Sequence, residues 1–194
     1  MYFSYLDLPP IPQEYISLCY KNLDLIDVDP RLEELNSYRG SMNRATYVPV
    51  VVKEWIKQNI LMPIFNSSNH DMLLNITRYR IHPTDPSRNG THGEHIDKER
   101  NFAINYYFDL GGEDTCVKWY SDFTKNGGRE IAITKKLYPE KWCLLYVNPI
   151  VHSVSNIEPN RNRIFISIAV TVDDLVTFDP IKEFKHVIDE SSLI

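Results

Sequence analysis

A series of short apolar segments, separated by turn residues, constrains the fold of this chain most strongly. From residue 72 the sequence MLLNITRYRI alternates apolar and polar residues, as a half-buried strand does, and a loop with two prolines and two glycines follows it. Gly111 and Gly112 mark a turn and indicate an antiparallel hairpin. The strands expected after that loop span residues 102–110, 115–120, 142–147, 151–155 and 163–170. Short strands at this spacing are typical of a sandwich or jelly roll.

Helices are expected only towards the two ends of the chain. The predicted helices near the N-terminus span residues 13–23 and 30–37, and one near the C-terminus spans residues 180–190. A further helix begins near Pro49, and its apolar residues recur at helical spacing until Pro63 ends the pattern. We expect that helix to lie across the outside of the sheet.

The length and composition are those of a single globular domain. The 194 residues, of which 43% are hydrophobic, can bury a core without disulfides or structural metals. We expect residues 1–70 to wrap the core with their helices, residues 71–171 to form the β core, and residues 172–194 to form a tail with a helix. The predicted fold class is mainly β, with flanking helices at both ends.

The charge pattern disfavours polyanionic partners. The formal net charge is -5, and no run of Lys or Arg offers a surface for a nucleic-acid backbone or an acidic membrane. The first residues, MYFSYLDLPPIPQ, contain neither a basic segment nor a long apolar one, and no apolar stretch reaches the roughly 20 residues of a membrane span. These features predict a cytoplasmic protein that does not insert into a membrane.

The cysteines fit the same compartment. Cys19, Cys116 and Cys143 are odd in number and far apart, which fits neither a disulfide framework nor a zinc site built from cysteine pairs. We interpret all three as buried, small hydrophobic residues in a reducing environment.

His95 and Asp97 are the first candidates for chemistry. Alternate residues of a strand share a face, so both side chains point the same way while Ile96 points into the packing. Two histidines and one carboxylate form a facial triad that leaves three positions of a metal open, as in non-haem Fe(II) oxygenases. The sequence must therefore supply a second histidine.

His152 is the best candidate for that second histidine. It follows the strand and turn WCLLYVNPIV and begins the next strand. The choice of the first histidine stays open, because His82 and His92 lie in the loop before His95 and either could replace it in another register. Asp97 is the carboxylate ligand whichever of these histidines is the first ligand.

Arg163 lies eleven residues after this histidine, on the strand RIFISIAV. It shares a face with Phe165 and Ser167, whereas the isoleucines occupy the other face. A buried guanidinium needs an anionic partner, and its planar fork matches a carboxylate at two points. A carboxylate-bearing cosubstrate would meet that need, and the hydroxyls of Ser167 and Tyr79 could contribute hydrogen bonds. Asn105, inside the run FAINYYF, is either a pocket residue or a buried amide satisfied by backbone.

The order of these segments resembles the Fe(II)- and 2-oxoglutarate-dependent dioxygenases. The segments are TRYRI, HID, a Gly-Gly hairpin, WCLLYVNPIVHSV and RIFISIAV, and the resemblance covers residues 75–170. It implies a double-stranded β-helix, which is a jelly roll of the cupin-like type, and it implies Fe(II), 2-oxoglutarate and O2 as cofactor and cosubstrates. It assigns iron binding to His95, Asp97 and His152, and 2-oxoglutarate binding to Arg163, with Tyr79 and Ser167 as weaker candidates. His92 and Asn105 remain candidates for the pocket.

One position departs from the family pattern. A hydroxyl often follows the arginine by two residues, where this chain has Phe165. The resemblance nevertheless implies an enzyme that hydroxylates a C–H bond of a small molecule or a protein side chain while it decarboxylates 2-oxoglutarate. One alternative is a cupin-type metal protein without 2-oxoglutarate, although the chain lacks a His-x-His motif. Another is a catalytically silent jelly-roll binding module.

Overall fold

The computed structural model describes residues 2–24, 41–65, 72–79, 92–97, 100–123, 129–158, 161–170 and 179–193. The helix expected over residues 30–37 and the alternative ligand His82 lie outside these residues.

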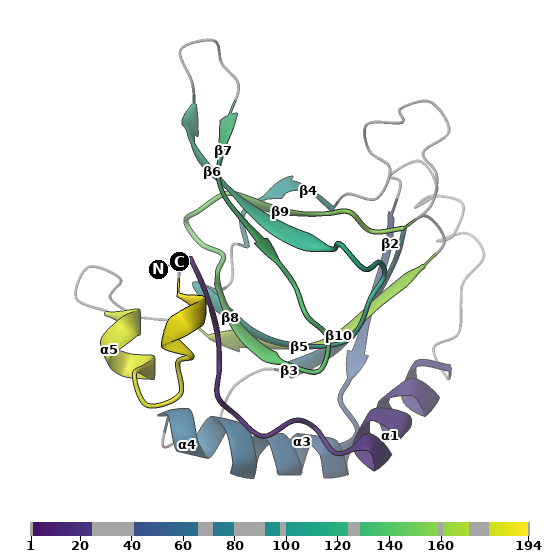
Figure 1. The fold of residues 1–194 in the computed structure, drawn as a ribbon. Coiled ribbons are helices and arrows are strands. Elements are labelled where there is room, and N and C mark those ends of the chain that lie inside the picture. Colours follow the sequence, from purple (N-terminus) through teal and green to yellow (C-terminus); the bar gives the residue numbers. More distant parts are fainter. Residues whose placement is uncertain are drawn as a thin grey trace.

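Two antiparallel sheets face each other in the described part of the chain (Figure 1). The first has six strands in the order β1-β8-β5-β10-β3-β2, and the second has four in the order β4-β9-β6-β7. The first sheet consists of β1 (Phe3–Tyr5), β2 (Ser41–Tyr47), β3 (Met72–Tyr79), β5 (Phe102–Leu110), β8 (Trp142–Tyr146) and β10 (Asn162–Val170). The second consists of β4 (His92–His95), β6 (Cys116–Phe123), β7 (Arg129–Lys136) and β9 (His152–Ser155). The prediction of a mainly β jelly roll is confirmed.

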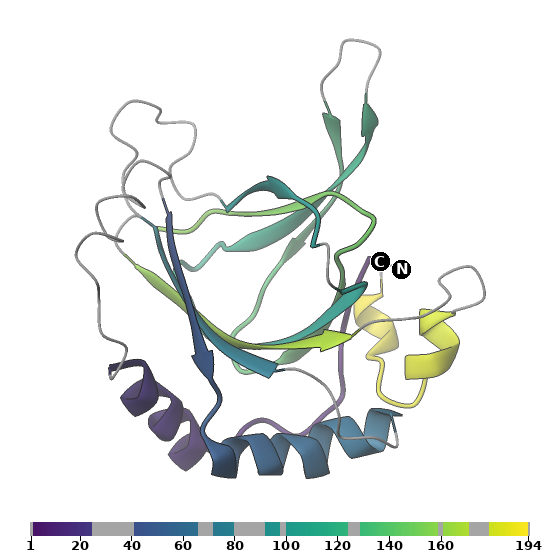
Figure 2. The same ribbon diagram turned by 180° about the vertical axis from the view of Figure 1, so that it is seen from behind.

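Helices cover the outer face of the six-stranded sheet (Figure 2). They are α1 (Gln13–Asp24), α3 (Val50–Ile56), η1 (Lys57–Leu61) and α4 (Met62–Phe65). The C-terminal α5 (Pro180–Phe184) and η3 (Glu190–Ser192) lie beside the sheet, where the Tyr5 backbone N–H of β1 donates a hydrogen bond to Ser192 (Figure 1). Val52, Ile56 and Ile60 are fully buried and belong to one apolar cluster with outward-facing residues of the sheet. The helix expected after Pro49 therefore lies where the sequence predicted it.

Two helix ends differ from the prediction. The helix does not stop at Pro63, because the π-helical turn η1 precedes it and α4 continues to Phe65. A proline has no backbone N–H, so it cannot donate the i to i−4 hydrogen bond of an α-helix. In a π-turn the hydrogen bonds span five residues instead of four, so the backbone pairing just before Pro63 is not that of a regular α-helix. The helix expected over residues 180–190 ends at Phe184, and Asp189 caps a separate short turn by accepting a hydrogen bond from the Ser191 backbone.

The alternation along β5 and β10 determines what faces the interior. Ile104 and Ile166 pack outward, in the cluster that contains the helices. Ala103 and Tyr107 belong instead to a second cluster between the two sheets, against which Phe165 packs. The inner face of the six-stranded sheet therefore carries the odd-numbered residues in this region, and these include polar side chains.

All three cysteines lie in the described part of the chain. Cys19, Cys116 and Cys143 are all buried and free of disulfides, as expected. Burial raises the pKa of the Cys19 thiol to about 12, so it stays protonated at neutral pH. None of the described helices has the length and apolar character needed to span a bilayer.

Candidate metal centre

The pairing of β4 with β9 places two histidines side by side. His95 and His152 are direct partners in the antiparallel register, and their ring centroids lie 4.3 Å apart. The register shifts between His92 and His95, so β4 contains an irregularity just before His95. Partners across neighbouring strands point to the same face, which brings both imidazoles to one place.

Asp97 completes the group just after β4 ends. Its backbone N–H donates a hydrogen bond to the carbonyl of Val147 at 3.2 Å, which fixes the chain as it leaves the strand. Its Oδ1 lies 3.6 Å from Nε2 of His95. One ligand atom each from His95, Asp97 and His152 lies within 4.8 Å of the others, so the three can hold one metal ion.

His152 is kept neutral by its surroundings. Burial and the neighbouring His95 lower its pKa to about 4. Its Nδ1 lies 3.4 Å from the carbonyl oxygen of Ile150, and a carbonyl only accepts, so this hydrogen bond requires the tautomer with the proton on Nδ1. This leaves Nε2 as the nitrogen that can bind a metal.

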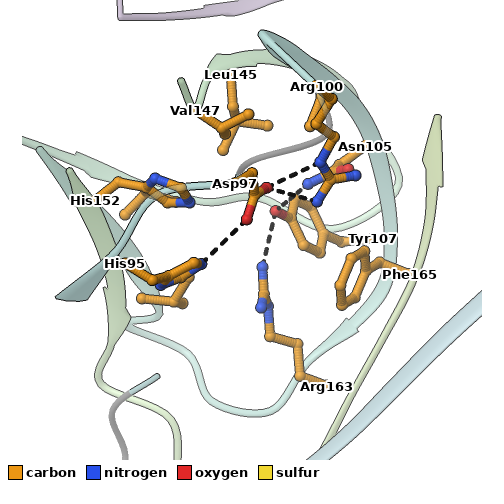
Figure 3. Close-up of a pocket in the computed structure, with 13 residues that line it drawn as sticks. His95, Asp97, Arg100, Asn105, Tyr107, Leu145, Val147, His152, Arg163 and Phe165 are labelled. Carbon is orange, nitrogen blue, oxygen red and sulfur yellow. Dashed lines mark hydrogen bonds and ion pairs between the residues drawn. The ribbon is translucent and has the colours of Figure 1, made fainter. Parts of the chain in front are cut away.

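The three residues open into a pocket of about 230 Å³ between the sheets (Figure 3). Its described lining combines charged and polar groups with small apolar side chains. The lining residues are His95, Asp97, Arg100, Ala103, Asn105, Tyr107, Val117, Leu145, Val147, His152, Val154, Arg163 and Phe165. The polar groups come from both sheets, with Asn105, Tyr107 and Arg163 on β5 and β10, and His95 and His152 on β4 and β9.

Arg163 reaches into this pocket from β10 (Figure 3). Its side chain is buried, with the residue only 6% exposed, and its Nη2 donates a hydrogen bond to the Tyr107 hydroxyl at 2.9 Å. The guanidinium lies 4.9 Å from the ring centre of Tyr107 and 4.5 Å from that of Phe165. Phe165, which departs from the family pattern, thus contributes a ring face to the cation instead of a hydroxyl.

Arg100 is a pocket residue that the sequence analysis missed. Its Nε donates to Oδ2 of Asp97 at 2.9 Å, and its Nη2 lies 2.8 Å from the same oxygen. Its Nη1 donates to the Ser167 hydroxyl at 2.6 Å. The segment HIDKER looks like an ordinary polar loop, so no local pattern marks Arg100. Ser167, which we expected beside Arg163, therefore contacts a different arginine.

Asn105 also faces the pocket. Its Nδ2 donates to the Tyr107 hydroxyl at 3.0 Å, whereas its Oδ1 is buried and has no hydrogen-bond partner among the described residues. Of the two interpretations left open by the sequence, the structure favours a pocket residue over an amide satisfied by backbone. A buried carbonyl oxygen without a donor is costly, and a ligand that donates a hydrogen bond would satisfy it.

Two candidates cannot be placed by their side chains. Tyr79 ends β3 and His92 begins β4, opposite Val154, but both side chains lie outside the described part of the structure. The geometry brings together His95, Asp97 and His152, with Arg163 in the same pocket.

Comparisons with known proteins find solved structures that match at low identity and low TM-score. The chain resembles a prolyl-4-hydroxylase from Pseudomonas putida, with 12% identity, a TM-score of 0.43, and coverage of 88% of this chain and 91% of that chain. It also resembles the Fe(II)/α-ketoglutarate-dependent dioxygenase TqaL, with 10% identity, a TM-score of 0.43, and coverage of 87% and 78%. Coconut allergen cocosin matches with 13% identity, a TM-score of 0.34, and coverage of 69% and 27%. No protein-family model and no curated protein matches the sequence.

Proposed function

We propose that this protein is an Fe(II)- and 2-oxoglutarate-dependent oxygenase. The observation that carries the proposal is the group of His95, Asp97 and His152, which opens into a pocket that also contains the buried guanidinium of Arg163. His95 comes from β4, Asp97 from the segment just after it, His152 from β9 and Arg163 from β10, so the fold itself assembles them.

The donor atoms suit Fe(II). Two imidazole nitrogens and one carboxylate oxygen form a mixed N/O set, which is the two-His-one-carboxylate arrangement that leaves further positions open to ligands. The neutral state of His152 means that no proton has to leave before its Nε2 binds. Oδ1 of Asp97 faces His95, while Arg100 occupies Oδ2.

The charge of the pocket suits a dicarboxylate. Among the described lining residues, Arg100 and Arg163 are cationic and Asp97 is anionic, and a bound Fe(II) ion adds two positive charges. A dianion such as 2-oxoglutarate offsets most of this excess. Arg163 offers its planar fork to the far carboxylate. We propose that the Tyr107 hydroxyl assists it beside the expected Tyr79, and in place of Ser167, which contacts Arg100.

The residues of this chain bind, orient and shield the reactants. When bound, Fe(II) and 2-oxoglutarate supply the oxidation, in which O2 provides one oxygen atom to the substrate C–H bond and one to succinate while CO2 is released. Val117, Val147 and Val154 contribute apolar surface to the pocket that limits access of water. The substrate in this proposal is a small molecule or a protein side chain, which agrees with the acidic net charge.

The test is a spectroscopic titration without oxygen. Fe(II) and then 2-oxoglutarate are added to the metal-free protein, and we expect a visible charge-transfer band from the chelated complex. Folded protein that binds Fe(II) but develops no band would indicate a cupin-type metal protein. Folded protein that binds neither would indicate a silent binding module.

A further inference from the structure

Arg100 connects a candidate metal ligand to strand β10 of the other sheet. Its guanidinium contacts Oδ2 of Asp97 through two nitrogens, at 2.9 and 2.8 Å, and contacts the Ser167 hydroxyl through the third, at 2.6 Å. The sequence separation between Arg100 and Ser167 is 67 residues, so the contact joins the segment after β4 to β10. Figure 3 shows the guanidinium of Arg100 beside Asp97, whereas that of Arg163 points towards Tyr107.

These contacts distinguish the two oxygens of one carboxylate. Oδ2 of Asp97 receives the arginine fork, whereas Oδ1 lies 3.6 Å from Nε2 of His95, on the side of the two imidazoles. A carboxylate without such a partner can turn and present both oxygens to a metal. A carboxylate held by a charge-assisted hydrogen bond at one oxygen presents the other.

We infer that Arg100 is a positioning residue that holds Asp97 as a one-oxygen metal ligand and so keeps a further coordination position open. The inference rests on the metal-binding part of the proposed function. It does not depend on the identity of the substrate.

The hydrogen bond from Arg100 to Ser167 explains why position 100 is an arginine. The guanidinium has a rigid fork with donors on three nitrogens, so it can contact Asp97 and Ser167 at once, whereas a lysine ammonium acts as a single point. β10 also carries Arg163, the proposed cosubstrate anchor. Strand β10 therefore helps to orient Asp97, through Ser167 and Arg100, and also carries Arg163.

Co(II) is a suitable probe, because the intensity of its visible absorption reports how many ligands surround it. Co(II) is titrated into the metal-free wild-type protein and into the variants Arg100→Gln, Arg100→Lys and Ser167→Ala, and both affinity and spectrum are recorded. The matched control is Arg161→Gln, which removes an arginine that is 57% exposed and pairs only at 3.9 Å with Glu158. Circular dichroism confirms that each variant is folded.

We expect Arg100→Gln to weaken Co(II) binding by about tenfold or more, in line with the effects of other residues that orient metal ligands. We also expect a weaker visible absorption per bound ion, since Asp97 can then contribute both oxygens. Arg100→Lys and Ser167→Ala should change both quantities in the same direction by less, and Arg161→Gln should change neither.

An unchanged spectrum and affinity in folded Arg100→Gln would overturn the inference and leave the proposed function intact. If Arg100→Gln does not fold, Ser167→Ala decides, because it removes only the anchoring hydroxyl; a wild-type spectrum in that variant overturns the inference. If the wild-type protein binds no Co(II), the proposed metal centre and this inference both fail.

Discussion

The hydroxyl of Tyr107 accepts hydrogen bonds from two sides, at 2.9 Å from Nη2 of Arg163 and at 3.0 Å from Nδ2 of Asn105. A phenol oxygen can accept two hydrogen bonds and donate one, so its proton is directed to a third group. Burial raises the pKa of Tyr107, although the nearby Arg163 opposes this, and the hydroxyl stays protonated. A carboxylate held by Arg163 is a suitable acceptor for that proton.

Tyr107→Phe should therefore weaken 2-oxoglutarate binding without affecting the metal. Loss of one hydrogen bond to a charged group corresponds to about 1.5–3 kcal/mol, or roughly ten- to a hundredfold in affinity. Calorimetric titration of the Fe(II)-loaded protein under anaerobic conditions measures the effect. The control is Tyr120→Phe, which removes a hydroxyl that contacts Ser153 at 2.8 Å. Equal losses in the two variants would contradict a specific role for Tyr107.

Variants of Arg163 and His152 should affect different binding steps, the first 2-oxoglutarate binding and the second Fe(II) binding. We expect Arg163→Gln to weaken 2-oxoglutarate binding by about a hundredfold or more, since it removes both hydrogen bonds of the fork, and to retain Fe(II). We expect His152→Ala to weaken Fe(II) binding itself. Equilibrium dialysis for the metal and calorimetry for 2-oxoglutarate give the two affinities. Unchanged 2-oxoglutarate affinity in Arg163→Gln would show that another group holds the far carboxylate.

The stability of the metal-free protein should depend on pH through His152. Its folded pKa of about 4 lies below the unfolded value of 6.5, so the unfolded chain binds more protons between these two values. The free energy of unfolding should therefore fall as the pH decreases from about 6.5 to about 4, and His152→Gln should reduce that slope. Urea unfolding at a series of pH values measures it, and identical slopes in both proteins would exclude this contribution.

The turn at Gly111 should not tolerate a larger residue. Its φ is +74°, and an added Cβ would lie 2.9 Å from Cγ2 of Ile157 and 3.5 Å from Cβ of Arg163. We expect Gly111→Ala to destabilise the protein by about 1–3 kcal/mol, from backbone strain together with this contact. The midpoint of thermal unfolding provides the measurement. A midpoint equal to that of the wild-type protein would show that the hairpin adjusts without cost.

The sequence predicted the inner face of β10 but not that of β5. In β10 the isoleucines alternate with Arg163, Phe165 and Ser167, so the two faces differ in character. In β5 the run FAINYYF is apolar on both faces, because helices cover one side and the second sheet covers the other. Only the tertiary packing shows that Asn105 faces the pocket.

Strands with weak local signals were missed for related reasons. Most of β7 is exposed, and its residues REIAITKK resemble a polar loop, whereas β1 contains only three residues. The role of Arg100 was missed because its contact with Ser167 bridges 67 residues. By contrast, His95, Asp97 and His152 could be proposed together, because the resemblance pointed to all three. The alternation expected through Asp97 was wrong in detail, since β4 ends at His95 and Ile96, expected to point into the packing, is 40% exposed.

The position of β4 in its sheet has a consequence for folding. This strand is at one edge and pairs on one side only, with β9, in the described structure. A metal ion bound by His95 and His152 would cross-link the edge strand to its neighbour, and its binding free energy would add to the stability of that pair. Chelation would then loosen the edge first, and the backbone amides of β4 would exchange with solvent earlier than those of β5 at the centre of the other sheet.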